Sequence, residues 1–276
     1  MTKQTYRRCA GLILGALIGL AFGSVSQGVN SLFLPGIPLY QPPFGPIGNS
    51  LLASLPRAEY QRLESLLEPV TLRFGGVLHE PGERIQYVYF PIDCVVALLT
   101  TVKGRQAVEV ALVGHEGMVG SPLALGIYTS FRRATVHGTG TAMRVESARF
   151  RKEILQSRPL QEILFRYKHA LVGQIAQSAA CKQFHPVKER LARHLLMTGD
   201  CARSSNIRLT HEILARALGV QRAAVTVAAR ALRKSKLIKY ARGKITILDR
   251  NGLIAASCEC YRIINRIYDD SVYAGV

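Results

Sequence analysis

The sequence has few of the residues that mark several common classes of protein. Its 276 residues include no tryptophan, six cysteines, and 18 acidic residues against 36 basic ones. Six cysteines in a chain of this length are too sparse for a scaffold held by disulfides. A hydrophobic content of 48% excludes wholesale disorder, and the length suits about two domains that each bury a core. The shortage of acidic residues leaves a net charge of +18, which calls for an anionic partner such as nucleic acid or an acidic membrane surface.

The positive charge is concentrated in one part of the chain. Residues 187–250 hold 15 basic and 4 acidic residues, so these 64 residues carry more than half of the excess charge. A solvated surface without a function mixes the two signs more evenly. The local basic block therefore favours contact with phosphates.

Residues 1–48 differ from the rest of the chain. Three basic residues precede an uncharged apolar run over residues 9–23, as in a signal peptide, but fifteen residues are short for a membrane span of about 20. A linker-like stretch rich in Gly, Ser, Pro and Asn follows. One interpretation is export or a membrane tether through residues 9–23; the other is an upstream start codon that adds a segment the working protein lacks. We favour the second and expect a cytoplasmic protein, because an exported protein would not meet the DNA that the basic block suits.

The pattern of residues 49–146 predicts a short helix followed by a β-domain. Ser54 is expected to cap the helix, with Pro56 in its first turn. Alternating or unbroken apolar segments predict strands, and glycines mark the corners between them. Many short strands at such spacing favour a β-roll or jelly roll. The strands are expected over residues 70–74, 85–90, 94–101, 106–113, 134–137 and 141–145, the last two joined as a hairpin through residues 138–140.

Residues 147–185 are predicted to form one long helix and a hinge. Apolar residues recur along the helix at spacings of three and four, close to a heptad seam. Such a seam packs either on the β-domain of its own chain or against a second chain, and we favour the dimer. Pro186 ends the helix, so Phe184 and His185 are expected in the hinge. The dimer residues expected from the seam are Leu160, Leu164, Tyr167, Leu171 and Ile175.

Residues 186–250 have the pattern of a winged helix-turn-helix. Thr210 is expected to cap the second of three helices, and Gly219 suits the left-handed residue between two crossed helices. The alternation of residues 237–248 around Arg242-Gly243 predicts a hairpin, or wing. The three helices are expected over residues 186–197, 210–217 and 221–234, and a C-terminal helix or tail over residues 251–276.

The third helix carries the residues expected to contact DNA. The major groove admits one α-helix, whose N-terminal residues reach the base edges. Arg can bond guanine, and Gln adenine, at two points each, so Gln221 and Arg222 are candidates for base readout, with Thr226 one turn further on. Nearby cations would contact phosphates, which position the protein without specifying a sequence. These cations are Arg216, Arg230, Arg233, Lys234, Lys239, Arg242 and Lys244; for Arg230 and Arg233, a solvated surface charge is an equally good interpretation.

This module resembles that of a known family. The core Leu218-Gly-Val-Gln-Arg-Ala-Ala-Val225 is similar to the signature of the Crp/Fnr family of bacterial transcription regulators. Short segments of the β-domain, at residues 80–83, 89–91 and 114–120, fit the family in order. The resemblance covers most of residues 49–250 and none of residues 1–45. It implies a homodimer that binds double-stranded DNA and contacts RNA polymerase, with an α+β fold made of a cyclic-nucleotide-binding-like β-roll (49–146), a dimerisation helix and hinge (147–185) and a winged helix (186–250).

The β-domain departs from the family members that bind cyclic AMP. Those members place a Glu after the glycine of the phosphate cassette, to bond the ribose hydroxyl, and use an Arg with Ser or Thr for the cyclic phosphate. Here Gly120 is followed by Ser121 and Pro122, and Arg132 or Arg133 retains the cationic partner only. The lost charge-assisted bond is worth roughly 1.5–3 kcal/mol, so we expect no tight binding of cyclic AMP. An unknown small-molecule effector in this pocket stays an alternative.

The recognition helix also departs from the cyclic-AMP receptor. Arg222 matches the family's base-reading Arg, whereas Ala223 and Val227 stand where that receptor has polar base contacts. The operator is therefore expected to differ from the receptor's operator.

The cysteines do not predict a cofactor. Fnr-like members ligate an iron–sulfur cluster through clustered N-terminal cysteines, and the six cysteines here form no such cluster. Cys258 and Cys260 are the only close pair, and Cys-x-Cys alone is not a zinc spacing. Residues two apart on a helix diverge by about 200°, so both could ligate one metal only if the helix is broken there. We favour one buried and one exposed cysteine and a structural role for His185 and His194, and we name no metal and no cofactor.

The sequence therefore predicts a homodimeric, sequence-specific DNA-binding regulator that does not respond to cyclic AMP. Helix-turn-helix dimers bind half-sites about one turn, or 34–36 Å, apart, so the operator is expected to be a near-palindrome. Two alternatives remain: a membrane-tethered regulator, and a ligand-binding module whose β-domain binds a small molecule. Because the β-domain sequence offers no nucleophile–base–orienter set, we do not expect an enzyme.

Overall fold

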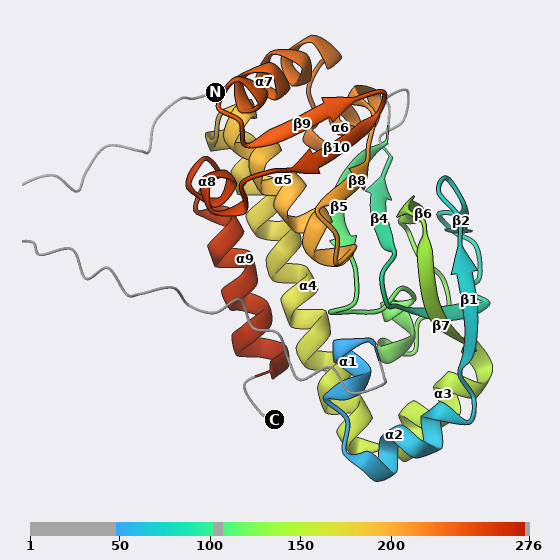
Figure 1. Cartoon of the computed structure of the whole chain (residues 1–276). Coiled ribbons are helices and arrows are strands. Elements are labelled where there is room, and N and C mark those ends of the chain that lie inside the picture. The colour runs from blue at the N-terminus through green and yellow to red at the C-terminus, as the bar shows by residue number, and fades with distance from the viewer. Residues whose placement is uncertain (1–47, 102–106, 274–276) are drawn as a thin grey trace, which may run out of the picture. The chain divides into compact units, whose positions relative to one another are not determined.

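The computed structural model describes residues 48–101 and 107–273 (Figure 1). The apolar run over residues 9–23 lies outside the described residues. Within them, every helix is too short or too polar to cross a membrane. The fold is mixed: two short helices and a β-rich part come first, a long helix follows, and a second group of helices with a small sheet completes the described chain.

Two antiparallel sheets make up the β-rich part, with strand orders β1-β7-β3 and β2-β6-β4-β5. Their apolar side chains share one buried core, in which Phe90, Val96 and Val145 are almost fully enclosed. This arrangement agrees with the β-roll or jelly roll expected from the strand pattern. The bounds are β1 Glu68–Leu72, β2 Val77–His79, β3 Tyr87–Pro91, β4 Val95–Thr100, β5 Val108–Val113, β6 Arg133–Gly138 and β7 Gly140–Glu146, with a short 3-10 helix η1 over Ser121–Leu125.

The hairpin expected through residues 138–140 is wrong. β6 pairs with β2 and β4, whereas β7 pairs with β1 and β3, so the chain passes from one sheet to the other at this point. The local glycines make that passage possible, because a Cβ on Gly140 would lie only 2.7 Å from the backbone oxygen of Asp93. The glycines at 138 and 140 therefore mark a change of chain direction, but they do not specify which strands pair.

The helix ahead of the β-rich part also begins differently from the expectation. Ser54 ends helix α1 (Ser50–Ala53), and its hydroxyl donates to the Leu51 carbonyl oxygen at 2.8 Å. Helix α2 (Arg57–Glu64) begins after Pro56 without a side-chain cap. The serine thus closes one helix instead of opening the next.

The single long helix expected over residues 147–182 is two helices. They are α3 (Ser147–Gln156) and α4 (Arg158–Phe184). The hydroxyl of Ser157 accepts a hydrogen bond from the Leu160 N–H at 3.1 Å, and Pro159 lies in the first turn of α4. A proline is tolerated in a first turn but breaks a helix interior, so Ser157 and Pro159 together end one helix and begin the next.

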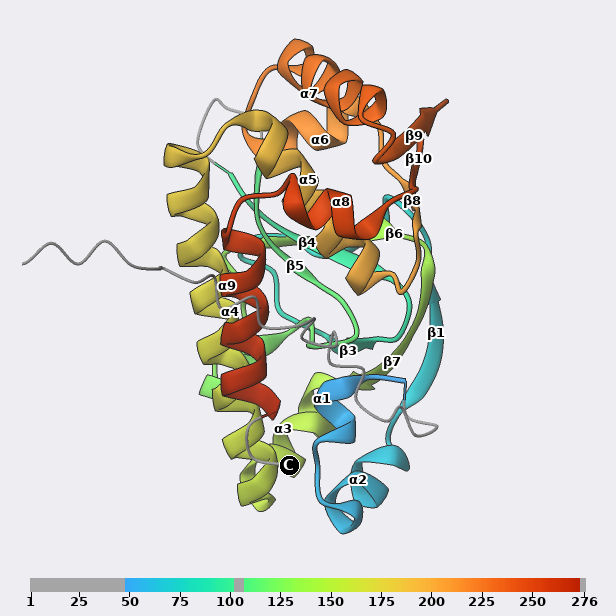
Figure 2. The same cartoon turned by 60° about the vertical axis from the view of Figure 1, so that its left-hand side comes forward.

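The rest of the chain forms a winged helix and a C-terminal pair of helices. Strands β8, β10 and β9 form a three-stranded antiparallel sheet, of which β8 was not predicted. Helix α9 runs alongside α4, and the two views agree on this (Figure 2). The helices approach closely where a Cβ on Gly173 would lie 2.9 Å from the Ile267 side chain. The bounds are α5 Val187–Cys201, β8 Asn206–Arg208, α6 His211–Leu218, α7 Arg222–Lys234, β9 Ile238–Ala241, β10 Lys244–Ile247, α8 Arg250–Ala255, α9 Cys260–Tyr268 and η2 Asp269–Tyr273.

Candidate nucleic-acid interface

Helices α6 and α7 are joined by a turn of the kind that the sequence predicted. The Thr210 side chain accepts a hydrogen bond from the Ile213 N–H and so caps α6. Gly219 has a φ of +64°, a left-handed conformation that is strained for residues with a Cβ. Gln221 is the N-cap of α7, whose first helical residue is Arg222. The apolar residues that recur at helical spacing along α7 are all buried: Val225, Ala228, Ala229 and Leu232.

The opposite face of α7 is exposed from its first turn onward. Gln221, Arg222 and Ala223 are all exposed at the start of the helix. Val227, one turn further on, has 68% of its surface exposed although it is apolar. The helix therefore presents two polar side chains that can bond to base edges, beside two apolar ones.

Thr226 is held within the chain. Its hydroxyl donates to the Arg222 carbonyl oxygen at 3.1 Å and lies 3.0 Å from Nδ1 of His211, so the histidine N–H donates to the threonine oxygen. The His211 ring stacks on Tyr240 with centroids 4.5 Å apart. Burial, and to a lesser degree the charge of Arg222, lowers the pKa of His211, which favours the neutral imidazole. His211 and Tyr240 were missed in the sequence, because they join α6, α7 and the wing only in the fold.

The wing follows the expected pattern. Strands β9 and β10 pair on either side of Arg242 and Gly243, both of which have positive φ. Arg242 also lines an open groove of about 660 Å³ together with Arg73 and Arg208, neither of which the sequence singled out. The wing tip is thus bordered by three arginines.

The expected phosphate contacts share two properties. All seven cations are exposed, and within residues 48–101 and 107–273 none of them forms an ion pair. Their charge is therefore not compensated by nearby carboxylates of the described chain. These residues are Arg216, Arg230, Arg233, Lys234, Lys239, Arg242 and Lys244.

The comparisons with known proteins agree with this geometry. Residues 189–256 match the family model of the Crp-like helix-turn-helix domain. The chain carries a Crp-like helix-turn-helix domain. The comparison with curated proteins found no match.

Solved structures extend the likeness beyond the Crp-like domain. FixK2 from Bradyrhizobium japonicum aligns with a TM-score of 0.58 at 13% identity, over 70% of this chain and 98% of its own. A putative Crp/Fnr regulator from Eubacterium rectale has a TM-score of 0.58 at 17% identity, over 76% of this chain and 98% of its own. The c-di-GMP-responsive regulator CLP from Xanthomonas campestris has a TM-score of 0.55 at 13% identity, over 70% and 99%. At these identities the likeness establishes the fold, which is that of the Crp/Fnr regulators.

The expected effector residues lie in the β-domain that precedes the Crp-like domain. Arg133 forms an ion pair with Glu80, its Nε donating to both carboxylate oxygens at 2.9 Å. Arg132 is buried, its guanidinium lies 4.9 Å from the Phe131 ring centroid, and burial lowers its pKa. Gly120, with a φ of +103°, precedes the buried Ser121 at the start of η1. Only Arg132 of the two arginines is therefore without a carboxylate partner in the described chain.

The residues expected at a dimer interface pack instead against other parts of the same chain. Leu160, Leu164, Tyr167 and Leu171 are buried, and the Tyr167 hydroxyl donates to the Met118 carbonyl oxygen at 2.9 Å. Ile175 packs against the same core and is partly buried. The expectation that this seam contacts a second chain is wrong, because α4 lays it against its own β-domain and α9.

The C-terminal cysteines also differ from the expectation. Cys258 and Cys260 are both buried, with 3% and 0% exposure, so the interpretation of one buried and one exposed cysteine is wrong. Cys258 precedes α9 and Cys260 is its first residue, so the helix does not include both. They lie beside Cys181 and His185 of the segment that leads into the Crp-like domain, and these four residues could hold a metal ion. His194, by contrast, is buried, and its Nδ1 lies 3.4 Å from Oε1 of the buried Glu109, which agrees with a structural role.

Proposed function

We propose that this chain is a homodimeric, sequence-specific DNA-binding transcription regulator of the Crp/Fnr type. The observation that carries the proposal is the exposed face of α7, bordered by cations that have no carboxylate partners in the described chain. Isolated exposed cations are often solvated, but seven within 29 residues, with no ion pair among them, form a local positive field. Phosphates bind such a field by releasing counterions, which gives the affinity.

Sequence recognition is assigned to the start of α7. Gln221 and Arg222 carry the polar base readout, because the first residues of a recognition helix reach furthest into the major groove. Ala223 and Val227 are exposed and apolar, and such side chains contact the methyl group of thymine. Thr226 was expected to read bases, but its two internal hydrogen bonds suit a positioning role that holds the first turn of α7 to His211.

Dimerisation is assigned to a different stripe of α4 from the one the sequence favoured. Phe165, His169, Val172, Ala176 and Ala179 are all exposed and recur at spacings of four and three. Phe165 is 48% and Val172 is 55% exposed, so two large apolar side chains of α4 face solvent along this stripe. The alanines allow a second helix to approach closely. A second copy of α4 packed along this stripe would form a coiled coil with a heptad repeat.

The remaining parts of the proposal concern partners, location and effector. Contact with RNA polymerase and a cytoplasmic location are inferred from the likeness to Crp/Fnr regulators, and we infer no enzymatic activity. The absence of response to cyclic AMP is supported by Ser121 and Pro122 in the phosphate cassette and by the Glu80 carboxylate that occupies Arg133. Calorimetry with cyclic AMP should give no binding heat at micromolar concentrations, and micromolar affinity would overturn this part. A small-molecule effector of another kind in the β-domain stays a second candidate, favoured by the buried Arg132, whose Nε has no hydrogen-bond partner in the described chain.

The proposal is tested by selecting binding sites from random duplexes with the full chain. We expect enrichment of a near-palindrome whose half-sites lie about one helical turn apart, and a footprint over both half-sites. Enrichment of no sequence, or equal retention of all duplexes in dilute salt, would contradict sequence-specific binding.

The dimer is tested separately by sedimentation. Val172→Asp places a charge in the exposed stripe and should convert the dimer to a monomer. Lys152→Asp, a charge change at an exposed position of α3, serves as the control and should leave the dimer intact. A wild-type chain that sediments as a monomer, or a Val172→Asp variant that remains a dimer, would refute the assignment of this stripe.

A further inference from the structure

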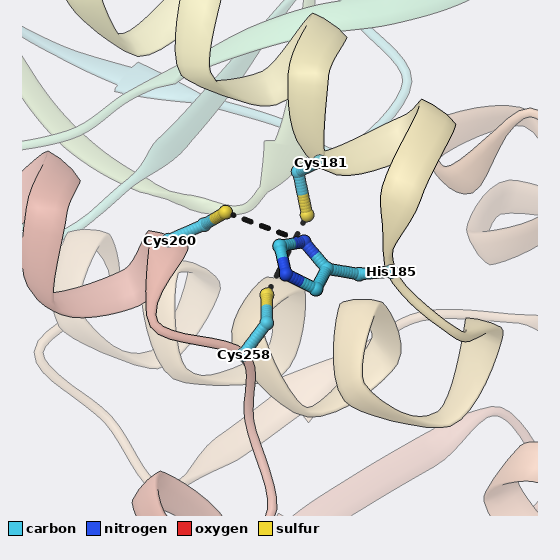
Figure 3. Close-up of side chains that lie close together, drawn as sticks. All are labelled: Cys181, His185, Cys258 and Cys260. Carbon is cyan, nitrogen blue, oxygen red and sulfur yellow. Dashed lines mark hydrogen bonds between the residues drawn. The ribbon is translucent and has the colours of Figure 1, made fainter. Parts of the chain in front are cut away.

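Four side chains converge where the end of α4 meets the start of α9 (Figure 3). Cys181 and His185 come from α4 and its C-cap, and Cys258 and Cys260 come from the segment that enters α9. Their ligand atoms all lie within 4.8 Å of one another. The Sγ atoms of Cys181 and Cys258 are 3.5 Å apart, and Sγ of Cys260 is 3.5 Å from Nδ1 of His185.

We propose that this cluster is a structural zinc site of the three-cysteine, one-histidine type. Zinc prefers a tetrahedron with Zn–S of about 2.3 Å and Zn–N of about 2.0–2.1 Å, which sets edges of about 3.8 Å between sulfurs and about 3.6 Å between sulfur and nitrogen. The Sγ–Sγ separation of Cys181 and Cys258 is about 0.3 Å shorter than the ideal edge, and the separation between Sγ of Cys260 and Nδ1 of His185 is about 0.1 Å shorter. Because no pair of ligand atoms exceeds 4.8 Å, closing the tetrahedron requires side-chain shifts of about 1 Å or less.

The backbone places the ligands on two short segments. Cys181 and His185 are four residues apart, so they lie on one face of a helical turn. Two cysteines two residues apart on one helix would point in different directions and could not bind the same metal. Here Cys258 lies before α9 and only Cys260 is helical, so both can bind one ion. Cys-x₃-His on one segment and Cys-x-Cys on the other therefore supply four ligands to one point.

The surroundings of the cluster suit a bound cation. Nε2 of His185 lies 3.0 Å from a carboxylate oxygen of Glu259, while Nδ1 faces the sulfur of Cys260. Zinc-bound histidines commonly donate their second ring N–H to a carboxylate in this way, which fixes the tautomer. The Gln177 amide nitrogen donates to Sγ of Cys260 at 3.0 Å, as suits a thiolate.

The ligand set also decides the class of site. The three cysteines are buried and four protein ligands complete a tetrahedron, which leaves no open position for a reacting molecule. Thiolate sulfur favours a soft or borderline cation such as Zn²⁺ over Mg²⁺ or Ca²⁺. Binding displaces the thiol protons into solvent and needs no oxidant or reductant.

The place of the site in the fold indicates what the metal would fix. His185 is the C-cap of α4, and Pro186 and α5 follow at once. A cation held there would tie α9 to the hinge through which the chain enters the Crp-like domain. Metal binding itself does not depend on the proposed DNA binding, and it is measured without DNA.

The test uses the full chain purified without chelator, followed by elemental analysis and by replacement of the metal with Co²⁺. We expect about one zinc ion per chain, and a sulfur-to-cobalt charge-transfer absorption after replacement. Cys258→Ser should lose both signals. Cys94→Ser removes a buried cysteine of the β-domain that lies outside the cluster and should keep both.

A second variant keeps the test valid if Cys258→Ser fails to fold. Glu259→Gln alters an exposed carboxylate that touches the His185 ring without being a ligand, and it should lower zinc affinity about 10- to 100-fold. Four results would overturn the proposal: no zinc above background after incubation with Zn²⁺, iron with inorganic sulfide in place of zinc, a Cys181–Cys258 disulfide in the purified chain, or unchanged affinity in Glu259→Gln.

Discussion

Replacing Arg222 with alanine isolates what one guanidinium contributes to sequence recognition. The side chain is exposed at the first position of α7 and forms no ion pair within the described part of the chain. The hydrogen bond that Thr226 makes here is to the Arg222 backbone oxygen, so alanine retains it. The free energy of unfolding should therefore change by less than about 0.5 kcal/mol.

The effect on DNA binding should be much larger. A bidentate bond from Arg to guanine is worth about 1–3 kcal/mol, which corresponds to an increase of about 5- to 150-fold in Kd for each half-site. The loss should be confined to one base position, because the other contacts of α7 are unchanged.

The assay is fluorescence anisotropy with duplexes that carry each of the four bases at each operator position. The wild-type chain should discriminate at the position that Arg222 contacts, and Arg222→Ala should bind all four bases there alike. Arg230→Ala is the matched control: as a phosphate contact it should weaken binding to every duplex and reduce the slope of log K against log salt by about one. Full discrimination in Arg222→Ala, or a uniform loss like that of Arg230→Ala, would refute the assigned role.

Three further predictions concern the Crp-like domain and the β-domain. Val227→Ala should leave the free energy of unfolding within about 0.5 kcal/mol of the wild-type value, since the side chain is exposed. It should also reduce the loss of affinity that the wild-type chain shows when one thymine is replaced by uracil, because alanine keeps only part of the apolar contact with the thymine methyl group. Gly219→Ala should cost about 1–2 kcal/mol of unfolding free energy in urea titrations; no atom lies within 4 Å of the added Cβ, so the strain of a φ of +64° accounts for the whole cost. Burial lowers the pKa of His115 to about 4, so the unfolded chain binds this proton near pH 6.5 and the folded chain only near pH 4. The contribution of neutral His115 to the free energy of unfolding is therefore present in full above pH 6.5 and is lost as the pH falls toward 4. Thermal unfolding across that range should show a loss of about 3 kcal/mol from this group. An equal loss in the His115→Asn variant would contradict this prediction.

The sequence predicts the winged helix well because its signals are local. The cap at Thr210, the left-handed Gly219 and the alternation around Arg242 each act over a few residues, and each has the expected conformation. The buried face of α7 follows from the spacing of its apolar residues in the same way.

Features that depend on distant partners are not predictable from such signals. The glycines at 138 and 140 indicate a change of direction, but the pairing of β6 and β7 with strands of different sheets depends on the whole β-domain. The seam at Leu164 and Leu171 indicates an apolar face, but periodicity does not say whether its partner is the same chain or a second one. The break at Ser157, by contrast, has a local signal in Pro159.

The cysteine cluster shows the same limit. Cys181 and Cys258 are 77 residues apart, and their contact depends on the path of α9 along α4. Cys-x₃-His at the end of a helix is the one local signal that could have drawn attention to the pair Cys181 and His185. Joined with Cys258 and Cys260, it gives a ligand set that neither segment shows alone.

The central claim is that two copies of α7 enter successive turns of the major groove, and a cleavage reagent tethered to the helix measures this most directly. An iron chelate coupled to Ser235→Cys, at the exposed C-cap of α7 and outside the proposed base contacts, would cut the DNA close to the point where the helix ends. We predict two clusters of cuts in the selected operator, one in each half-site and about one helical turn apart. Cuts spread evenly along the duplex, or confined to one site, would contradict the account.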